Sequence, residues 1–135
     1  MFTSEQKAAI VRISFFIISA DGKIEDSEMD FSFAMWQLSG ITEQDIALAR
    51  QMTGLEACNI VTQMNEEDKA FVCALLGCTI VADGQAAEQE IRVWNTLTEI
   101  CDLPTMNLEQ AAQIIKSRLC RRLGYFIVKS CTEES

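Results

Sequence analysis

The most informative absence in this sequence is histidine, because none of the 135 residues is one. Histidine is the commonest general base and the commonest metal ligand, so Ser-His-Asp and Cys-His catalysis and most zinc sites are excluded. The chain has one proline, and 49% of its residues are hydrophobic against 23% charged. This composition excludes a disordered or fibrous chain and indicates one globular domain with a hydrophobic core.

Long hydrophobic runs and paired cysteine motifs are lacking as well. The longest apolar stretch, residues 70–82, is shorter than the roughly 20 residues that span a bilayer, so it predicts a buried helix. The six cysteines form no C-x-x-C pair, and most lie at apolar positions of helical patterns, where free thiols pack as small hydrophobes. The sequence opens without a basic region leading into a hydrophobic one. We therefore expect no secretory signal and a cytoplasmic protein with reduced thiols.

Basic residues are few, 11 against 20 acidic ones, and the net charge is −9. This balance argues against a nucleic-acid partner. Residues 116–135 nevertheless carry 5 bases and 2 acids, whereas residues 1–115 carry 6 bases and 18 acids. Two interpretations of this basic C-terminal end stay open. It is either a solvated helix terminus or, with the apolar run 125–128, a segment that docks onto a partner or an anionic membrane surface.

Helical periodicity and capping signals run along the chain. In four places a capping residue stands three positions before a side chain that can reach back to it: Thr3 and Gln6, Thr42 and Asp45, Asn65 and Asp68, Asn107 and Gln110. Gly40 and Gly54 each follow an apolar-periodic segment, as C-terminal caps do. The predicted helices are 4–20, 26–39, 43–53, 55–64, 66–82, 87–101 and 107–122. The predicted fold is an all-α compact bundle of about seven helices.

The sequence contains an internal repeat. Segment 19–29 (SADGKIEDSEM) aligns with segment 81–91 (VADGQAAEQEI), and the same offset aligns Lys7 with Lys69 and Ile41 with Leu103. We therefore predict a single domain over residues 1–135, built from two related helical halves at about 4–64 and 66–122. The apolar helix of each half is expected to pack at the centre of the bundle.

Each half carries an Asp-Gly pair with a glutamate six positions after the glycine, so Asp21 precedes Glu28 and Asp83 precedes Glu90. This spacing is the second half of a calcium-binding EF-hand loop, although the first two oxygen ligands are missing here. One interpretation is structural, with the carboxylates accepting hydrogen bonds from loop amides and locking the turn. The other is that the two turns converge on a hard divalent cation. The cation ligands would be Asp21, Glu28, Asp83 and Glu90, with Glu25, Asp26 or Glu88 nearby.

The ion expected at such a site follows from the ligands that the sequence offers. Carboxylate and carbonyl oxygens are hard ligands, and without histidine they are the first choice here. We therefore expect Ca²⁺, Mg²⁺ or Mn²⁺ before zinc or copper. No other cofactor is predicted.

The doubled Ala-Asp-Gly-x5-Glu motif, at residues 20–28 and 82–90, resembles the TerB domain of tellurite-resistance proteins and the related N-terminal region of DjlA-type co-chaperones. The resemblance covers roughly residues 3–119. It implies an all-helical domain in the bacterial cytoplasm, with attachment to the inner face of the membrane as one of its settings. It further implies a role in stress or tellurite response through divalent-cation binding and scaffolding of membrane complexes, not catalysis. The matching positions are Asp21, Gly22, Glu28, Asp83, Gly84 and Glu90.

The two copies of the motif differ. Residues 85–87 are Gln-Ala-Ala where residues 23–25 are Lys-Ile-Glu, so the second copy is poorer in acids and two identical ion sites are not expected. The leading prediction is a non-enzymatic module that binds a protein partner. Two alternatives remain. One is an enzyme that uses the four carboxylates for acid-base chemistry, and the other is an adaptor that docks onto proteins or a membrane surface without an ion.

Overall fold

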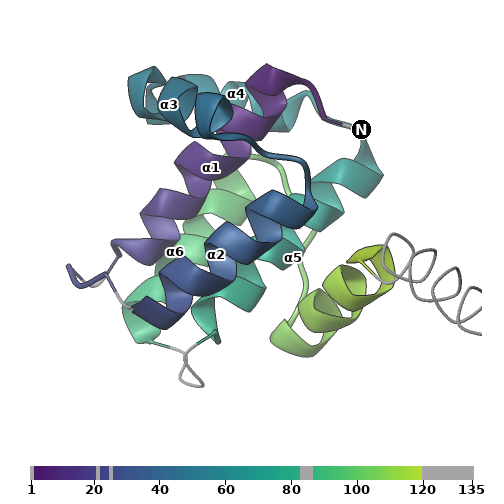
Figure 1. The fold of residues 1–135 in the computed structure, drawn as a ribbon. Coiled ribbons are helices and arrows are strands. Elements are labelled where there is room, and N and C mark those ends of the chain that lie inside the picture. The colour runs from purple at the N-terminus through teal and green to yellow at the C-terminus, as the bar shows by residue number, and fades with distance from the viewer. Residues whose placement is uncertain (1, 21, 25, 83–86, 120–135) are drawn as a thin grey trace, which may run out of the picture.

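The protein folds as a bundle of helices (Figure 1). A computed structural model describes residues 2–20, 22–24, 26–82 and 87–119. Within these ranges the chain forms seven helices and no strand, which confirms the all-α prediction. Six of them are α1 (Ser4–Ile18), α2 (Asp26–Leu38), α3 (Glu43–Gln51), α4 (Gly54–Thr62), α5 (Glu66–Ile80) and α6 (Glu88–Ile100). The seventh comprises residues 108–119.

Three of the four predicted capping pairs form reciprocal hydrogen bonds; in the fourth, the Asp68 N–H donates to Asn65 Oδ1 at 2.8 Å, while the Asp68 carboxylate pairs with Arg118. The Gln6 N–H donates to the Thr3 hydroxyl at 3.1 Å, and the Thr3 N–H donates back to Gln6 Oε1 at 2.9 Å. Thr42 with Asp45 and Asn107 with Gln110 make the same reciprocal pair of bonds. These bonds satisfy N–H groups that have no partner inside the first turn, so they fix where each helix begins.

The prediction for Gly54 as a C-terminal cap is wrong. Gly54 is the first residue of α4, whose N-cap is Thr53, and the C-cap of α3 is Met52, which has an extended conformation. The reason for a glycine here is a tertiary contact. A Cβ atom at Gly54 would lie 2.7 Å from Cζ of Phe16, a residue of α1 whose ring packs against the start of α4. Gly40, in contrast, has φ +77° just after α2, as a C-terminal cap requires.

The internal repeat recurs in the helix boundaries. The alignment that pairs Asp21 with Asp83 also pairs the first and last residues of α1 with those of α5, and the first and last residues of α2 with those of α6. The ends of α2 and α6 match too, because the Ile41 N–H donates to the Trp36 carbonyl at 2.8 Å and the Leu103 N–H to the Thr98 carbonyl at 2.9 Å. Both bonds close a Schellman turn around a residue of positive φ. The halves therefore share backbone geometry as well as sequence.

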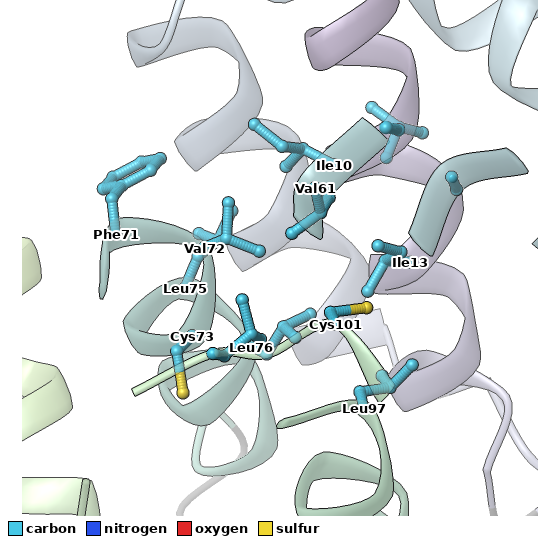
Figure 2. Close-up of a cluster of buried hydrophobic side chains, with 14 of the residues drawn as sticks. Ile10, Ile13, Val61, Phe71, Val72, Cys73, Leu75, Leu76, Leu97 and Cys101 are labelled. Atoms are coloured by element: carbon cyan, nitrogen blue, oxygen red, sulfur yellow. The ribbon is translucent and has the colours of Figure 1, made fainter. Parts of the chain in front are cut away.

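The centre of the bundle is built from α1 and α5. Both helices bury most of their residues, and α1 contacts each of α2, α3, α4, α5 and α6. Figure 2 shows Ile10 and Ile13 of α1 and Val72, Leu75 and Leu76 of α5 within this core. No helix among the described residues has both the length and the apolar character that crossing a membrane requires.

The helix ends that flank the two repeated turns lie at the same end of the bundle. In Figure 1, α1 and α5 end and α2 and α6 begin at the lower left of the view. The halves also cross over there, since α1 contacts α6 and α5 contacts α2. This crossing places the first turns of α2 and α6 against the central helices, where a polar side chain is taken out of water.

Candidate functional site

The two motif glutamates are the most deeply buried acids of the described residues. Glu28 is 1% exposed and Glu90 is 2% exposed. Each lies in the first turn of its helix, Glu28 in α2 and Glu90 in α6, as the motif spacing predicts. A negative charge is favoured there, because the free N–H groups of the first turn and the positive end of the helix macrodipole attract it. Both side chains also have interaction partners in the structure.

The acids next to these glutamates in sequence behave differently. Asp26 and Glu88 are exposed, and Glu88 forms an ion pair with Arg92 on the outer face of α6, with 2.7 Å between the two atoms. Of the three additional ligands that the sequence suggests, these two therefore lie at the surface. The third, Glu25, lies outside the described residues, as do Asp21 and Asp83.

The first turn itself has the backbone that its Asp-Gly sequence calls for. Gly22 has φ +78°, a conformation that side chains rarely adopt. The second glycine of the motif, Gly84, lies outside the described ranges. Among the residues that the structure describes, no three His, Cys, Asp or Glu side chains are grouped so that they could hold a metal. The described part of the candidate site thus consists of two buried carboxylates at one end of the bundle.

One buried hydroxyl near Glu28 escaped the sequence analysis. Ser32 lies one turn further along α2 and is 1% exposed, and its Oγ has no hydrogen-bond partner among the described residues. At the equivalent position of α6 in the repeat stands Trp94, whose indole N–H donates to the Cys73 carbonyl at 3.0 Å. The glutamate is thus present in both halves of the repeat, whereas the residue one turn further along the helix differs, Ser32 in α2 and Trp94 in α6.

A second feature is an apolar groove between α4 and α6, which we call the α4–α6 groove. It encloses about 440 Å³. Its lining residues are Phe16, Gly54, Leu55, Cys58, Val93, Thr96, Leu97 and Ile100. Two of them are strongly exposed for large hydrophobic side chains, Leu55 at 73% and Ile100 at 56%. The groove was not predictable from the sequence, whose only signal for it is the presence of these two large hydrophobic residues off the core-facing stripes.

A cleft of about 570 Å³ lies beside the seventh helix and is lined by Pro104, Met106 and Arg118, among others. Arg118 belongs to the basic C-terminal end. Its guanidinium donates to Asp68 at 3.2 Å and lies 4.4 Å from the ring centre of Phe71. This arginine therefore ties the seventh helix to α5. Arg121, Arg122 and the apolar run 125–128 lie outside the described residues, so the docking interpretation stays a prediction.

The cysteines that the structure describes are free thiols in or against the core. Burial raises the pKa of the Cys78 thiol to about 11. Burial, together with the neighbouring Cys58 thiol, raises the pKa of Cys101 to about 12. High pKa values keep both thiols protonated and unreactive at neutral pH, which agrees with the packing role predicted from the sequence.

The fold and the doubled turn define a class, that of small all-helical proteins with two related halves and a buried glutamate in each. No family model matches the chain, and no curated protein matches it. The fold is similar to that of the crystal structure of a protein of unknown function, PG1108, from Porphyromonas gingivalis W83. The TM-score is 0.79 at 25% sequence identity, over 86% of this chain and 91% of that chain.

Proposed function

We propose that the chain is a non-enzymatic helical binding and scaffold module with a TerB-like cation site. In this proposal a divalent cation binds at the end of the bundle where the two Asp-Gly turns lie, and the ion-loaded domain engages a protein partner. We further propose a cytoplasmic stress response, of the tellurite-resistance type, as its setting, with the inner face of the membrane as one place of action.

The observation that supports the cation is the paired burial of Glu28 and Glu90. Removing an ionised carboxylate from water is costly unless nearby charges or hydrogen-bond donors compensate. The repeat buries two such carboxylates, each in the first turn of its helix, Glu28 in α2 and Glu90 in α6. A dication bound between the turns would compensate both carboxylates at once, and Asp21 and Asp83 precede them at the spacing of an EF-hand.

The two cavities described above favour binding over catalysis. Neither the α4–α6 groove nor the cleft beside Arg118 is lined by Glu28 or Glu90. An acid-base enzyme needs its carboxylates within reach of a substrate, which a cavity would hold against them. The two buried glutamates are better suited to an ion than to a substrate.

A thermal unfolding titration of the full chain tests the proposal. The melting temperature is followed with EDTA and then with millimolar Ca²⁺, Mg²⁺ or Mn²⁺ at constant ionic strength. An ion that binds only the folded state at 100 times its dissociation constant stabilises it by about 2.7 kcal/mol. For a domain of this size we expect a rise of several degrees.

Variants of the motif connect this response to the proposed ligands. Glu28→Gln, Glu90→Gln and Asp83→Ala should each abolish most of the ion-dependent rise. Glu99→Gln is the matched control, because Glu99 is an exposed acid in the last turn of α6. If no ion raises the melting temperature of the unmodified chain, while Glu90→Gln lowers it, the motif is a structural lock and the cation proposal is wrong.

A further inference from the structure

We propose that the α4–α6 groove is a binding site for an amphipathic carboxylate with a single aliphatic chain. The chain would lie against Leu55, Leu97 and Ile100, and the carboxylate would bind Arg12, which lies over the ring of the lining residue Phe16. This site is separate from the proposed cation site, because no residue of the doubled motif lines it.

The lining of the groove suits an aliphatic chain. Thr96 is the only lining residue with a hydroxyl group, and the walls are otherwise apolar side chains, one glycine and the Cys58 thiol. At about 440 Å³ its volume falls within the range of small-molecule sites. Exposed large hydrophobic side chains such as Leu55 and Ile100, gathered on one groove, are characteristic of a surface that is covered in use.

Arg12 supplies the reason for a carboxylate. Its Nε donates to the Met52 carbonyl at 2.8 Å, and its guanidinium carbon lies 4.9 Å from the ring centre of Phe16, which lines the groove. These two contacts fix the guanidinium plane. Its two terminal nitrogens form no hydrogen bond or ion pair with any described residue, so they remain for a ligand. A guanidinium binds a carboxylate through two parallel hydrogen bonds.

Arg12 differs from Lys69 and Arg92 in its charged partners. Lys69 and Arg92 hold ion pairs with acids of the protein, whereas Arg12 has no carboxylate partner among the described residues. It also belongs to residues 1–115, in which acids outnumber bases 18 to 6. An unpaired guanidinium next to an apolar groove suits a fatty-acid-like molecule. The guanidinium would bind the carboxylate, and the groove would hold the aliphatic chain.

Gly54 joins the two parts of the site. Because a Cβ at this position would lie 2.7 Å from Cζ of Phe16, only glycine lets the Phe16 ring lie against the start of α4. Phe16 thereby lines the groove and also contacts the Arg12 guanidinium. The apolar surface and the charge are thus held together by one aromatic ring.

An NMR titration of the full, ¹⁵N-labelled chain tests the inference with three probes. Decanoate has the chain and the carboxylate, decyltrimethylammonium has the chain and the opposite charge, and butyrate has the carboxylate alone. All are kept below the concentrations at which they self-associate. We expect saturable shifts in α4 and the last two turns of α6 with decanoate, binding about tenfold weaker for the ammonium probe, and none for butyrate in the same range.

Two variants with matched controls assign the ends of the ligand. Arg12→Gln should weaken decanoate binding about tenfold and leave the ammonium probe unchanged, while Arg50→Gln, at an exposed arginine outside the groove, should alter neither. Leu55→Ser should weaken both long-chain probes, and Leu48→Ser, at an exposed leucine of α3, should weaken neither. The spectrum of each variant without probe reports whether it is folded.

Three results would overturn the inference. The first is equal affinity for the two long-chain probes, which would mean that the carboxylate contributes nothing to binding. The second is a set of shifts scattered outside α4 and α6. The third is sedimentation of the chain as a dimer that Leu55→Ser converts to a monomer, since the groove would then be covered by a second copy of the protein.

Discussion

The Lys69 ammonium nitrogen lies 3.2 Å from the carboxylate oxygen Oδ2 of Asp102, and this pair joins the first turn of α5 to the end of α6. Lys69 is buried, and Asp102 holds a positive φ of 54° at the position where the first half has Gly40. The second half therefore replaces a conformationally permissive glycine with a residue whose charge neutralises a buried lysine. The ion pair compensates for a backbone conformation that is unfavourable for an aspartate.

Asp102→Ala should lower the free energy of unfolding by about 1–2 kcal/mol, because alanine removes the carboxylate beside Lys69 and is strained at positive φ. Asp102→Asn should cost less, since asparagine tolerates the left-handed region and loses only the charge. Urea denaturation at neutral pH measures both. Equal stability of the two variants would mean that the backbone conformation contributes nothing.

Gly22→Ala should destabilise the protein by about 1 kcal/mol, because Gly22 has φ +78°. No heavy atom lies within 4 Å of the Cβ that would be added, so the cost is conformational and not steric. Gly22→Asn should therefore recover part of the loss. Thermal unfolding compares the three proteins. An alanine variant as stable as the parent would contradict a left-handed residue in this turn.

Gly77→Ala should cost about 1–3 kcal/mol through overpacking. The added Cβ would lie 2.7 Å from Cζ2 of Trp94 and 3.2 Å from Cβ of Ala111, so both α6 and the seventh helix would have to move. A double-mutant cycle with Trp94→Phe, measured by urea denaturation, isolates the contact. We expect the alanine to cost less once the indole is absent, and purely additive losses would argue against this packing.

Stability should fall as the pH rises above about 9, in part through Cys101. The thiol pKa is 9.0 in an exposed setting and about 12 in the fold, so the folded state keeps a proton that the unfolded chain loses. The contribution is complete below pH 9 and is lost as the pH rises from 9 toward 12, amounting to about 1 kcal/mol at pH 10. Denaturation between pH 8 and pH 10 should show a shallower decline for Cys101→Ala. Parallel slopes would exclude Cys101 as a source.

The helices were predictable because their signals are local. Reciprocal caps such as Thr3 with Gln6 define a helix start within a single turn, and the internal repeat confirms one half from the other. Gly54 was misread because a glycine after an apolar segment also fits the start of the next helix. The contact that decides between them comes from Phe16, which belongs to α1 and is distant from Gly54 in the sequence.

The candidate site was predictable in position but not in burial. The spacing of the motif places Glu28 and Glu90 in first turns, but their nearly complete burial depends on how α2 and α6 cross the central helices. Likewise, the exposure of Leu55 and the unpaired terminal nitrogens of Arg12 depend on the packing of α4 against α1. Burial and exposure of this kind depend on how separate helices pack, so the periodicity within a single helix does not predict them.

The crossing of the two halves has a consequence for how the protein unfolds. Because α1 is covered in part by α6 and α5 in part by α2, neither half covers its own central helix completely. A chain cut between α4 and α5 would yield two pieces that each expose part of the buried face of a central helix. We therefore expect one cooperative transition for both halves, and recovery of the fold from the two pieces only when they are mixed.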